Sequence, residues 1–180
     1  SWRGLRYVVS QLEDGRNVKV RMLSASWKDL SNDQRKAVEF DRSELFRKVY
    51  SGEFGVAGGE PFSVLIGDYE IGPSVEDMAT LGGIAQSAAA AFAPFIAAAA
   101  PTMFGLDEFQ GLERPINLQR IFEQKEFIHW RRFRDEDEDS RFVGLTMPRV
   151  LSRLPYEDLQ PDDHGRPRVD GFRFHEDVDG

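Results

Sequence analysis

The pattern of apolar and polar residues near the start of the chain has a period of two. Apolar residues alternate with other residues over positions 5–9 and again over positions 18–22. This period is typical of strands that bury one face. Asp14-Gly15 lies between the two stretches and can form a turn, because glycine tolerates positive φ angles. The pattern therefore predicts an N-terminal β-hairpin over about residues 4–24.

A helical period follows the predicted hairpin. Residues 31–34 have the spacing of a capping box, and apolar residues recur at helical spacing up to Tyr50. Gly52 and Gly55 are expected to end this helix. The apolar run at residues 62–66 then predicts a strand that is covered on both faces.

A second helix is predicted over about residues 75–99, where alanine dominates. Ser74 is expected to cap its first turn together with Asp77. Pro94 is expected to kink or split this helix, because proline lacks a backbone N–H group. The uncharged run over residues 84–104 is too rich in alanine and too interrupted by proline for a membrane span, so a buried helix is expected there.

The last part of the pattern predicts one more helix and one more strand. The helix covers about residues 117–134 and ends in arginines, where cations complement the helix dipole. The strand covers residues 142–146, and a short turn or helix is expected over residues 148–153. This order of elements predicts an α/β fold with a mixed β-sheet and flanking helices.

The charge of the chain is unevenly distributed. Its 180 residues include 23 Lys and Arg against 31 Asp and Glu, which gives a formal net charge of −8. Residues 157–180 hold eight acids and three bases, contain prolines and glycines, and lack apolar periodicity. We therefore expect an α/β domain over residues 1–156 and an extended acidic segment over residues 157–180. The acidic balance argues against a nucleic-acid partner, which needs a basic face.

No motif for catalysis or binding is complete. The glycine-rich stretch at residues 52–59 lacks the Lys-Ser or Lys-Thr of a phosphate loop. The acidic run at residues 135–140 lacks the glycine and glutamate that a calcium loop needs. Bases and aromatics mix at residues 129–134, but the aromatic spacing there is more typical of a packed helix face than of a nucleic-acid site. Three histidines lack metal-binding spacing: His129, His164 and His175.

These observations lead us to assign no catalytic, cofactor-binding or metal-binding residue and to expect no cofactor. The sequence also has no cysteine, which excludes disulfides and thiolate chemistry within these residues. The alternative from another class is a carboxylate- or metal-dependent hydrolase. It would require Asp68, Glu70 or the run 135–139 to converge in one concave pocket with raised pKa values. A further alternative is a generic adaptor domain that binds one partner.

A series of short motifs runs in order along nearly the whole chain. They are Trp2-Arg3-Gly4-Leu5, Phe40-Asp41, Leu45-Phe46-Arg47-Lys48-Val49-Tyr50, Gly58-Gly59-Glu60-Pro61-Phe62, Ile66-Gly67-Asp68-Tyr69, Ala93-Pro94-Phe95, Phe104-Gly105-Leu106, Trp130 with Phe133-Arg134, Asp139-Ser140-Arg141-Phe142-Val143, Pro148-Arg149, Arg153-Leu154-Pro155-Tyr156, and Phe172 and Phe174 with Glu176. In this order they resemble the large subunit of the type VI secretion contractile sheath, the TssC/VipB family. Each motif is short, and their combined extent makes the resemblance specific.

The resemblance implies a structural subunit rather than an enzyme. In this family the large subunit pairs with a small sheath subunit, and the heterodimers stack with neighbouring sheath subunits around an inner tube protein in the bacterial cytoplasm. Contraction of the sheath drives the tube outward, and a AAA+ ATPase then recycles the sheath. Family members are much longer, so the resemblance implies an upstream fragment. It would lack the ATPase-recognition helix, which precedes the position of Trp2, and the later region that contributes to strand exchange. Neither a membrane nor a nucleic acid is implied as a partner.

Overall fold

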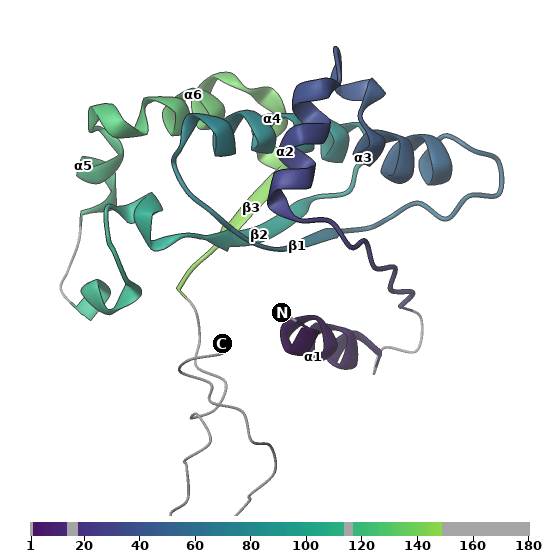
Figure 1. Ribbon diagram of the computed structural model, residues 1–180, viewed down its shortest axis with the longest axis horizontal. Helices are drawn as coiled ribbons and strands as arrows, with labels where there is room; N and C mark the ends of the chain where they lie inside the picture. The colour runs from purple at the N-terminus through teal and green to yellow at the C-terminus, as the bar shows by residue number, and fades with distance from the viewer. Residues whose placement is uncertain (1, 14–17, 114–116, 149–180) are drawn as a thin grey trace, which may run out of the picture. The chain divides into compact units, whose positions relative to one another are not determined.

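The computed structural model describes residues 2–13, 18–113 and 117–148 (Figure 1). Contacts along the chain divide it into two units, residues 1–148 and residues 149–180. The second unit lies outside the described residues. The acidic segment 157–180, the division after residue 156, the turn over residues 148–153, and His164 and His175 therefore stay predictions.

The described residues form three strands and a series of helical segments. In chain order these are α1 (Trp2–Glu13), α2 (Trp27–Lys36), the 3₁₀-helix η1 (Phe40–Arg42), α3 (Glu44–Phe46), the π-helical η2 (Arg47–Phe54), β1 (Leu65–Ile71), α4 (Val75–Ala90), β2 (Phe95–Ala99), η3 (Pro101–Phe104), η4 (Phe109–Glu113), α5 (Leu118–Phe122), η5 (Lys125–Phe127), α6 (Ile128–Glu136), η6 (Glu138–Phe142) and β3 (Val143–Thr146).

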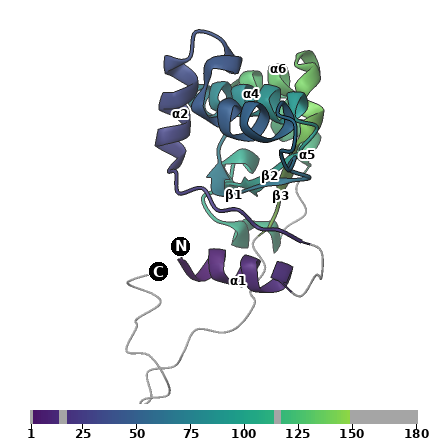
Figure 2. The same cartoon turned by 90° about the vertical axis from the view of Figure 1, so that its right-hand side faces the viewer.

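The sheet has the strand order β1-β2-β3, and both neighbouring pairs run parallel. Leu65 lies opposite Phe95, and Phe95 lies opposite Val143. Parallel neighbours need long crossover connections, and these contain α4 and the segment from α5 to α6. Figure 1 and Figure 2 both show α2, α4 and α6 on one side of the sheet. The predicted α/β class is confirmed, and the described strands are all parallel rather than mixed.

The core lies between the sheet and α4. Along β1, Gly67 and Ile71 are buried while Asp68 and Glu70 are exposed, which is the alternation of a strand with one covered face. The inward residues of β2 and the buried face of α4 meet in this core: Phe95, Ala97, Ala99, Leu81, Ile84, Ala85 and Ala88. The strand predicted at residues 62–66 begins at Leu65 instead, and the expectation that both of its faces are covered is wrong for the described residues.

The predicted N-terminal hairpin is wrong. Residues 2–13 form helix α1, and residues 18–26 are extended without a strand partner. The sequence of α1 fits both periods, because Leu5, Val8 and Leu12 also recur every three to four residues. A short alternation of five residues therefore gave too little information to separate a strand from a helix.

The first predicted helix begins earlier and is broken. Helix α2 is capped by Ser26, whose Oγ accepts from the backbone N–H of Asp29 over 3.2 Å, so the expected capping residues 31–34 lie inside the helix. After this break, a second helical segment begins at Ser43, which caps α3. Of the two glycines predicted to end the helix, Gly55 does so, because its N–H closes η2, whereas Gly52 lies inside η2.

The second predicted helix starts where expected and ends early. Ser74 caps α4 by accepting from the N–H of Asp77 over 3.0 Å. The helix ends at Ala90, the chain turns before Pro94, and the alanine-rich residues that follow form β2 instead of more helix. The packing of a central strand overrides the helix propensity of alanine here. None of the described helices is both long enough and apolar enough to cross a bilayer.

The third predicted helix is interrupted, and the last predicted strand is confirmed as β3. The helix begins near residue 117 as expected, where Asn117 caps α5 by accepting from the N–H of Arg120 over 3.1 Å. The helix stops at Phe122 and resumes as α6 after a short break. Arg131 spans this break, because its Nη1 donates to the carbonyl oxygens of Phe122 and Gln124 over 2.6 and 2.8 Å.

Candidate protein interface

The carboxylates proposed for a hydrolase do not come together. Asp68 and Glu70 are exposed on β1, whereas residues 135–139 lie at the end of α6 and in η6. The hydrogen bond from Arg134 lowers the pKa of Asp135, while a general acid needs a raised one. Among the described residues, no group of three or more His, Asp or Glu side chains could hold a metal ion. Asp68 and Glu70 therefore do not converge with the run 135–139, and Asp135 has the opposite pKa shift to the one that the hydrolase alternative requires.

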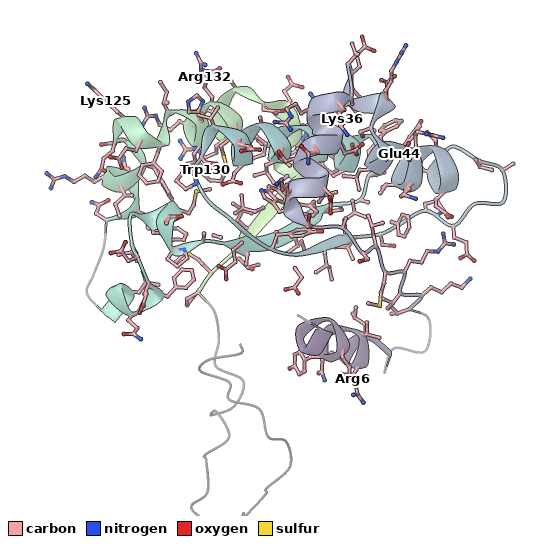
Figure 3. The ribbon with its side chains drawn as sticks, in the orientation of Figure 1. Arg6, Lys36, Glu44, Lys125, Trp130 and Arg132 are labelled. Carbon is pink, nitrogen blue, oxygen red and sulfur yellow. The ribbon has the colours of Figure 1, made fainter. Side chains whose placement is uncertain are left out.

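Helix α6 uses its aromatic residues for packing, as predicted for residues 129–134. Phe133 is buried, and the ring of Trp130 packs against it with centroids 6.0 Å apart. Figure 3 shows Arg132 and Lys125 pointing outward from α6 and η5. Arg134 Nε pairs with Oδ1 of the next residue, Asp135, over 2.7 Å, so the acidic run is a solvated turn beside a basic helix end.

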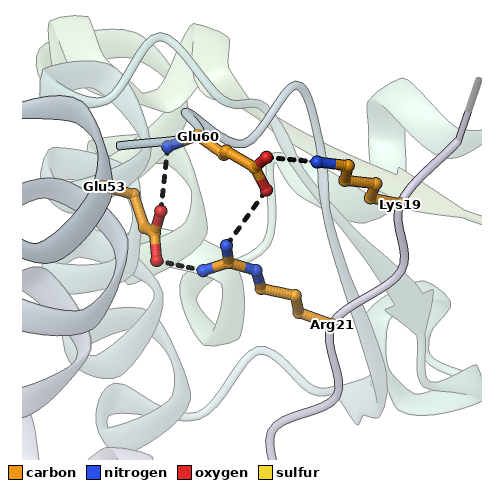
Figure 4. A network of polar contacts seen from close by, with 4 residues as sticks. All are labelled: Lys19, Arg21, Glu53 and Glu60. Atoms are coloured by element: carbon orange, nitrogen blue, oxygen red, sulfur yellow. Dashed lines mark hydrogen bonds and ion pairs between the residues drawn. The ribbon is translucent and has the colours of Figure 1, made fainter. Parts of the chain in front are cut away.

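Four charged side chains attach the extended segment 18–26 to the loop after η2 (Figure 4). The guanidinium of Arg21 pairs with Glu53, and its Nη2 lies 3.2 Å from Oε2 of Glu60. Lys19 pairs with the same Glu60 carboxylate. The backbone N–H of Glu60 donates to Oε2 of Glu53 over 3.0 Å. We call these four residues the charged clip.

The charged clip lowers the pKa of both of its carboxylates. The main cause for Glu53 is the hydrogen bond from the backbone of Glu60, followed by the one from Arg21. The main cause for Glu60 is the hydrogen bond from Lys19, and Glu53 in turn raises the pKa of Arg21. Lys19, Arg21 and Glu60 are exposed to water, whereas the Glu53 side chain is only 18% exposed, so the outer pairs of the clip are the ones most sensitive to salt. No local sequence signal could have indicated it, because its partners are far apart along the chain.

A second set of contacts fixes the end of segment 18–26. The hydroxyl of Tyr69 donates to the carbonyl oxygen of Ala25 over 2.7 Å, and Nε1 of Trp27 donates to Oδ1 of Asp77 over 2.7 Å. The rings of Trp27 and Tyr69 pack with centroids 5.4 Å apart. The pKa of the Tyr69 hydroxyl is raised, mainly because burial disfavours its charged form. The extended segment is therefore held by the core at one end and by the charged clip along its length.

A row of aromatic rings joins η1, η2 and η6 and includes both buried and exposed residues. Neighbouring ring centroids are 4.8 to 6.2 Å apart along the series Phe40, Phe46, Tyr50, Phe54, Phe92 and Phe142. Phe92 is 72% exposed and has a φ of 52°. A left-handed backbone costs a residue other than glycine about 1–2 kcal/mol. This combination of strain and exposure points to a role of Phe92 beyond packing.

Two grooves lie against the outer face of α4. The first has a volume of about 730 Å³ and runs between residues 37–40 and α6. The second has a volume of about 710 Å³ and runs from Phe40 past Phe92 to Phe142. Phe40 and Gln86 line both grooves, so the two are neighbours along α4. The sequence did not indicate either groove, because each wall comes from a different part of the chain.

Comparisons with known proteins extend over the whole chain. Residues 1–180 match the VipB family, described as "EvpB/VC_A0108, tail sheath N-terminal domain". The chain is also 42% identical, over 182 aligned residues, to the type VI secretion system sheath protein TssC1 of Pseudomonas aeruginosa PAO1. This similarity covers 100% of the chain and 35% of the relative, so the chain spans about a third of the length of that curated protein.

Proposed function

Because this chain belongs to the VipB family of tail sheath proteins, we propose that its full-length protein is the large structural subunit of a type VI contractile sheath. In this proposal the protein pairs with a small sheath subunit. The pairs stack helically with neighbouring sheath subunits around an inner tube protein in the cytoplasm. The role is mechanical rather than enzymatic, and a AAA+ ATPase recycles the contracted sheath. The observation that carries the proposal is the family match over all 180 residues.

The surface of the described residues is compatible with assembly. Large apolar side chains are exposed on several separate elements: Tyr7, Val38, Phe54, Phe92 and Ile128. Permanent protein interfaces are more apolar than an average protein surface. Contacts that join different faces of successive subunits generate helical filaments when they do not close into a ring. These features support a subunit that buries more than one face.

The test is co-expression of the full-length protein with its small sheath partner, followed by purification and electron microscopy. We expect the two chains to co-purify and to form tubules of regular diameter. Each chain expressed alone is the control, and neither is expected to form tubules. A monodisperse monomer in the co-expressed sample would contradict the proposed function.

A further inference from the structure

Arg21 fills a small site that is built by the end of η2 and the loop after it. Its guanidinium pairs with Glu53, and its Nη2 lies 3.2 Å from Oε2 of Glu60 (Figure 4). Its Cζ also lies 5.6 Å from the centroid of the Phe62 ring. Two carboxylates beside an aromatic ring suit a planar guanidinium, which donates in several directions and packs on ring faces. We call Glu53, Glu60 and Phe62 the guanidinium cradle.

The guanidinium cradle is held together by contacts that do not involve Arg21. The backbone N–H of Glu60 donates to Oε2 of Glu53 over 3.0 Å, which leaves Oε1 of Glu53 for Arg21. Gly59 lies so close to Glu53 that a Cβ atom there would be 2.1 Å from the carbonyl oxygen of Glu53. The ring of Phe62 packs against the hydrophobic core. The cradle is therefore expected to keep its shape when no guanidinium is bound.

The two carboxylates of the cradle differ in their exposure to water. The side chain of Glu53 is 18% exposed, whereas that of Glu60 is 50% exposed. Lys19 pairs only with Glu60 and is itself 75% exposed. Ion pairs between exposed side chains contribute little, because water and salt screen them. Arg21 is therefore expected to hold segment 18–26 more strongly than Lys19 does.

Residues 18–24, which we call the strap, depend on side chains for their attachment. Their backbone forms no backbone–backbone hydrogen bond to another residue that the structure describes. The large apolar side chains of the strap are 38–56% exposed, so they bury little surface: Val18, Val20, Met22 and Leu23. Within the described part of the chain, the strap is therefore attached mainly through Lys19 and Arg21.

The chain after the strap is attached by contacts of a different kind. The hydroxyl of Tyr69 donates to the carbonyl oxygen of Ala25, and Nε1 of Trp27 donates to Oδ1 of Asp77, both over 2.7 Å. The rings of Tyr69 and Trp27 also pack against the hydrophobic core. These partly buried contacts are screened less by salt than the exposed ion pairs are. The strap is thus able to leave the cradle while the chain stays fixed from Ala25 onward.

We propose that Glu53, Glu60 and Phe62 form a guanidinium-binding site that Arg21 occupies reversibly, so that residues 18–24 act as a releasable strap. The ligand class is a guanidinium group on an extended peptide, which in the closed state belongs to the chain itself. The strap is part of the connection between α1 and α2, and seven extended residues span about 23–25 Å. Its release frees that length of chain without unfolding either helix. The site and the strap go beyond the proposed function and do not depend on sheath assembly.

The first test empties the cradle and offers it a ligand from outside. The full-length protein with Arg21→Ala is titrated with a fluorescent peptide that has the sequence of residues 18–26, and anisotropy measures binding. The same peptide with Arg21→Lys is the matched control and is expected to bind about 10-fold more weakly. The wild-type protein is expected to bind the arginine peptide at least about 10-fold more weakly than the variant does, because its own strap competes at a high effective concentration.

Each result of the titration decides one part of the proposal. Equal binding of the arginine and lysine peptides would overturn the guanidinium assignment, because the site would then recognise charge alone. Equal binding by the wild type and Arg21→Ala would overturn the occupation of the cradle by Arg21. Neither result bears on the sheath function, which is tested by tubule formation.

The second test follows the strap in the protein with Arg21 in place. Val18→Cys or Ser24→Cys is paired with Ser51→Cys in the full-length protein, cysteines elsewhere are replaced by serine, and spin labels report the distance.

At about 0.1 M salt both pairs are expected to give one narrow distance distribution. At about 1 M salt, where the Debye length is about 3 Å, only the Val18 pair is expected to broaden. An unchanged Val18 pair would overturn the release of the strap, and equal broadening of both pairs would overturn the fixed end at Ala25.

Discussion

At the scale of single residues, several glycines are required for reasons that a motif search does not detect. The stretch 52–59 resembles a phosphate loop only in composition. Gly58 has a φ of 84°, which favours glycine, and a Cβ atom at Gly59 would lie 2.1 Å from the carbonyl oxygen of Glu53. The two adjacent glycines therefore let the loop turn and then pack tightly against the end of η2, beside the charged clip.

Gly59→Ala is expected to destabilise the fold more than Gly58→Ala does. Alanine at Gly58 has open space and costs only the left-handed strain, about 1–2 kcal/mol. Alanine at Gly59 must displace a backbone carbonyl, and overpacking of this kind costs about 1–3 kcal/mol, occasionally more. Thermal unfolding measures both variants. Equal melting temperatures for Gly59→Ala and the wild type would show that the close approach to Glu53 is not needed.

Gly67 offers a sharper comparison inside the core. A Cβ atom there would lie 2.6 Å from Cζ of the buried Phe95 ring, whereas one at Gly144 would lie 3.8 Å from Ile96. Gly67→Ala is expected to cost about 1–3 kcal/mol, because the ring cannot move without disturbing the core. Gly144→Ala is the control in a neighbouring part of the sheet and is expected to be neutral or stabilising by up to about 1 kcal/mol. Denaturant unfolding gives both values, and a neutral Gly67→Ala would refute the packing described here.

At the scale of elements, the sequence predicted an element well where a local chemical signal defined it. Ser74 was recognised as a cap, and it accepts a hydrogen bond from the backbone N–H three residues later. Gly55 was recognised as a helix end. In both cases the interaction that defines the element lies within a few residues of the signal. The strand at residues 143–146 was found from its apolar run, although its pairing partner β2 is distant in sequence.

The elements that were wrong depend on contacts between distant parts of the chain. Residues 95–99 are rich in alanine, and they form a strand because β1 and β3 pair with them on both sides. The cap of the first helix was expected at residues 31–34. Ser26 is the cap instead, while Ser31 is buried and donates to Glu76 on α4 over 2.9 Å. The sequence did not show this role of Ser31, because its partner on α4 is distant along the chain.

The cap at Ser26 leads to a prediction for α2. Ser26→Ala removes the acceptor for the N–H of Asp29, and such a loss typically costs about 1 kcal/mol. Ser51→Ala is the control, because Ser51 is exposed in η2, and changes at such sites usually stay within about 0.5 kcal/mol. Chemical denaturation of both variants tests the assignment. A cost for Ser51→Ala as large as that for Ser26→Ala would argue against a specific capping role.

At the scale of the whole molecule, the family could be inferred from the sequence but the surface grooves could not. The order of the short motifs indicated the sheath family, since that information is carried along the chain. The two grooves beside α4 and the charged clip join residues that are distant in sequence, and their composition alone is ordinary. The exposed Val38 and the strained Phe92 become informative only when the fold shows that Val38 lines the first groove and Phe92 the second.

The acidic groups also act together on the stability of the folded chain. The pKa values of Asp29, Glu53, Glu60 and Asp135 all lie below their ordinary values of 3.8 for Asp and 4.5 for Glu, because each accepts hydrogen bonds in the folded state. A carboxylate with a lowered folded pKa stabilises the fold above its unfolded pKa, and this contribution is lost as the pH falls through the folded value. The melting temperature is therefore expected to be level above about pH 5 and to fall below about pH 4.

The variant Glu53→Gln tests whether the charged clip contributes to this loss. It removes the charge that pairs with Arg21, so the melting temperature at pH 7 is expected to be slightly lower than that of the wild type. The melting temperature of Glu53→Gln is expected to fall less than that of the wild type between pH 7 and pH 3, because the variant lacks one of the carboxylates that gains a proton. Glu126→Gln, at an exposed position in η5, should keep the acid sensitivity of the wild type. If Glu53→Gln loses as much stability in acid as the wild type, the Glu53 carboxylate of the clip does not contribute to the acid sensitivity of the folded chain.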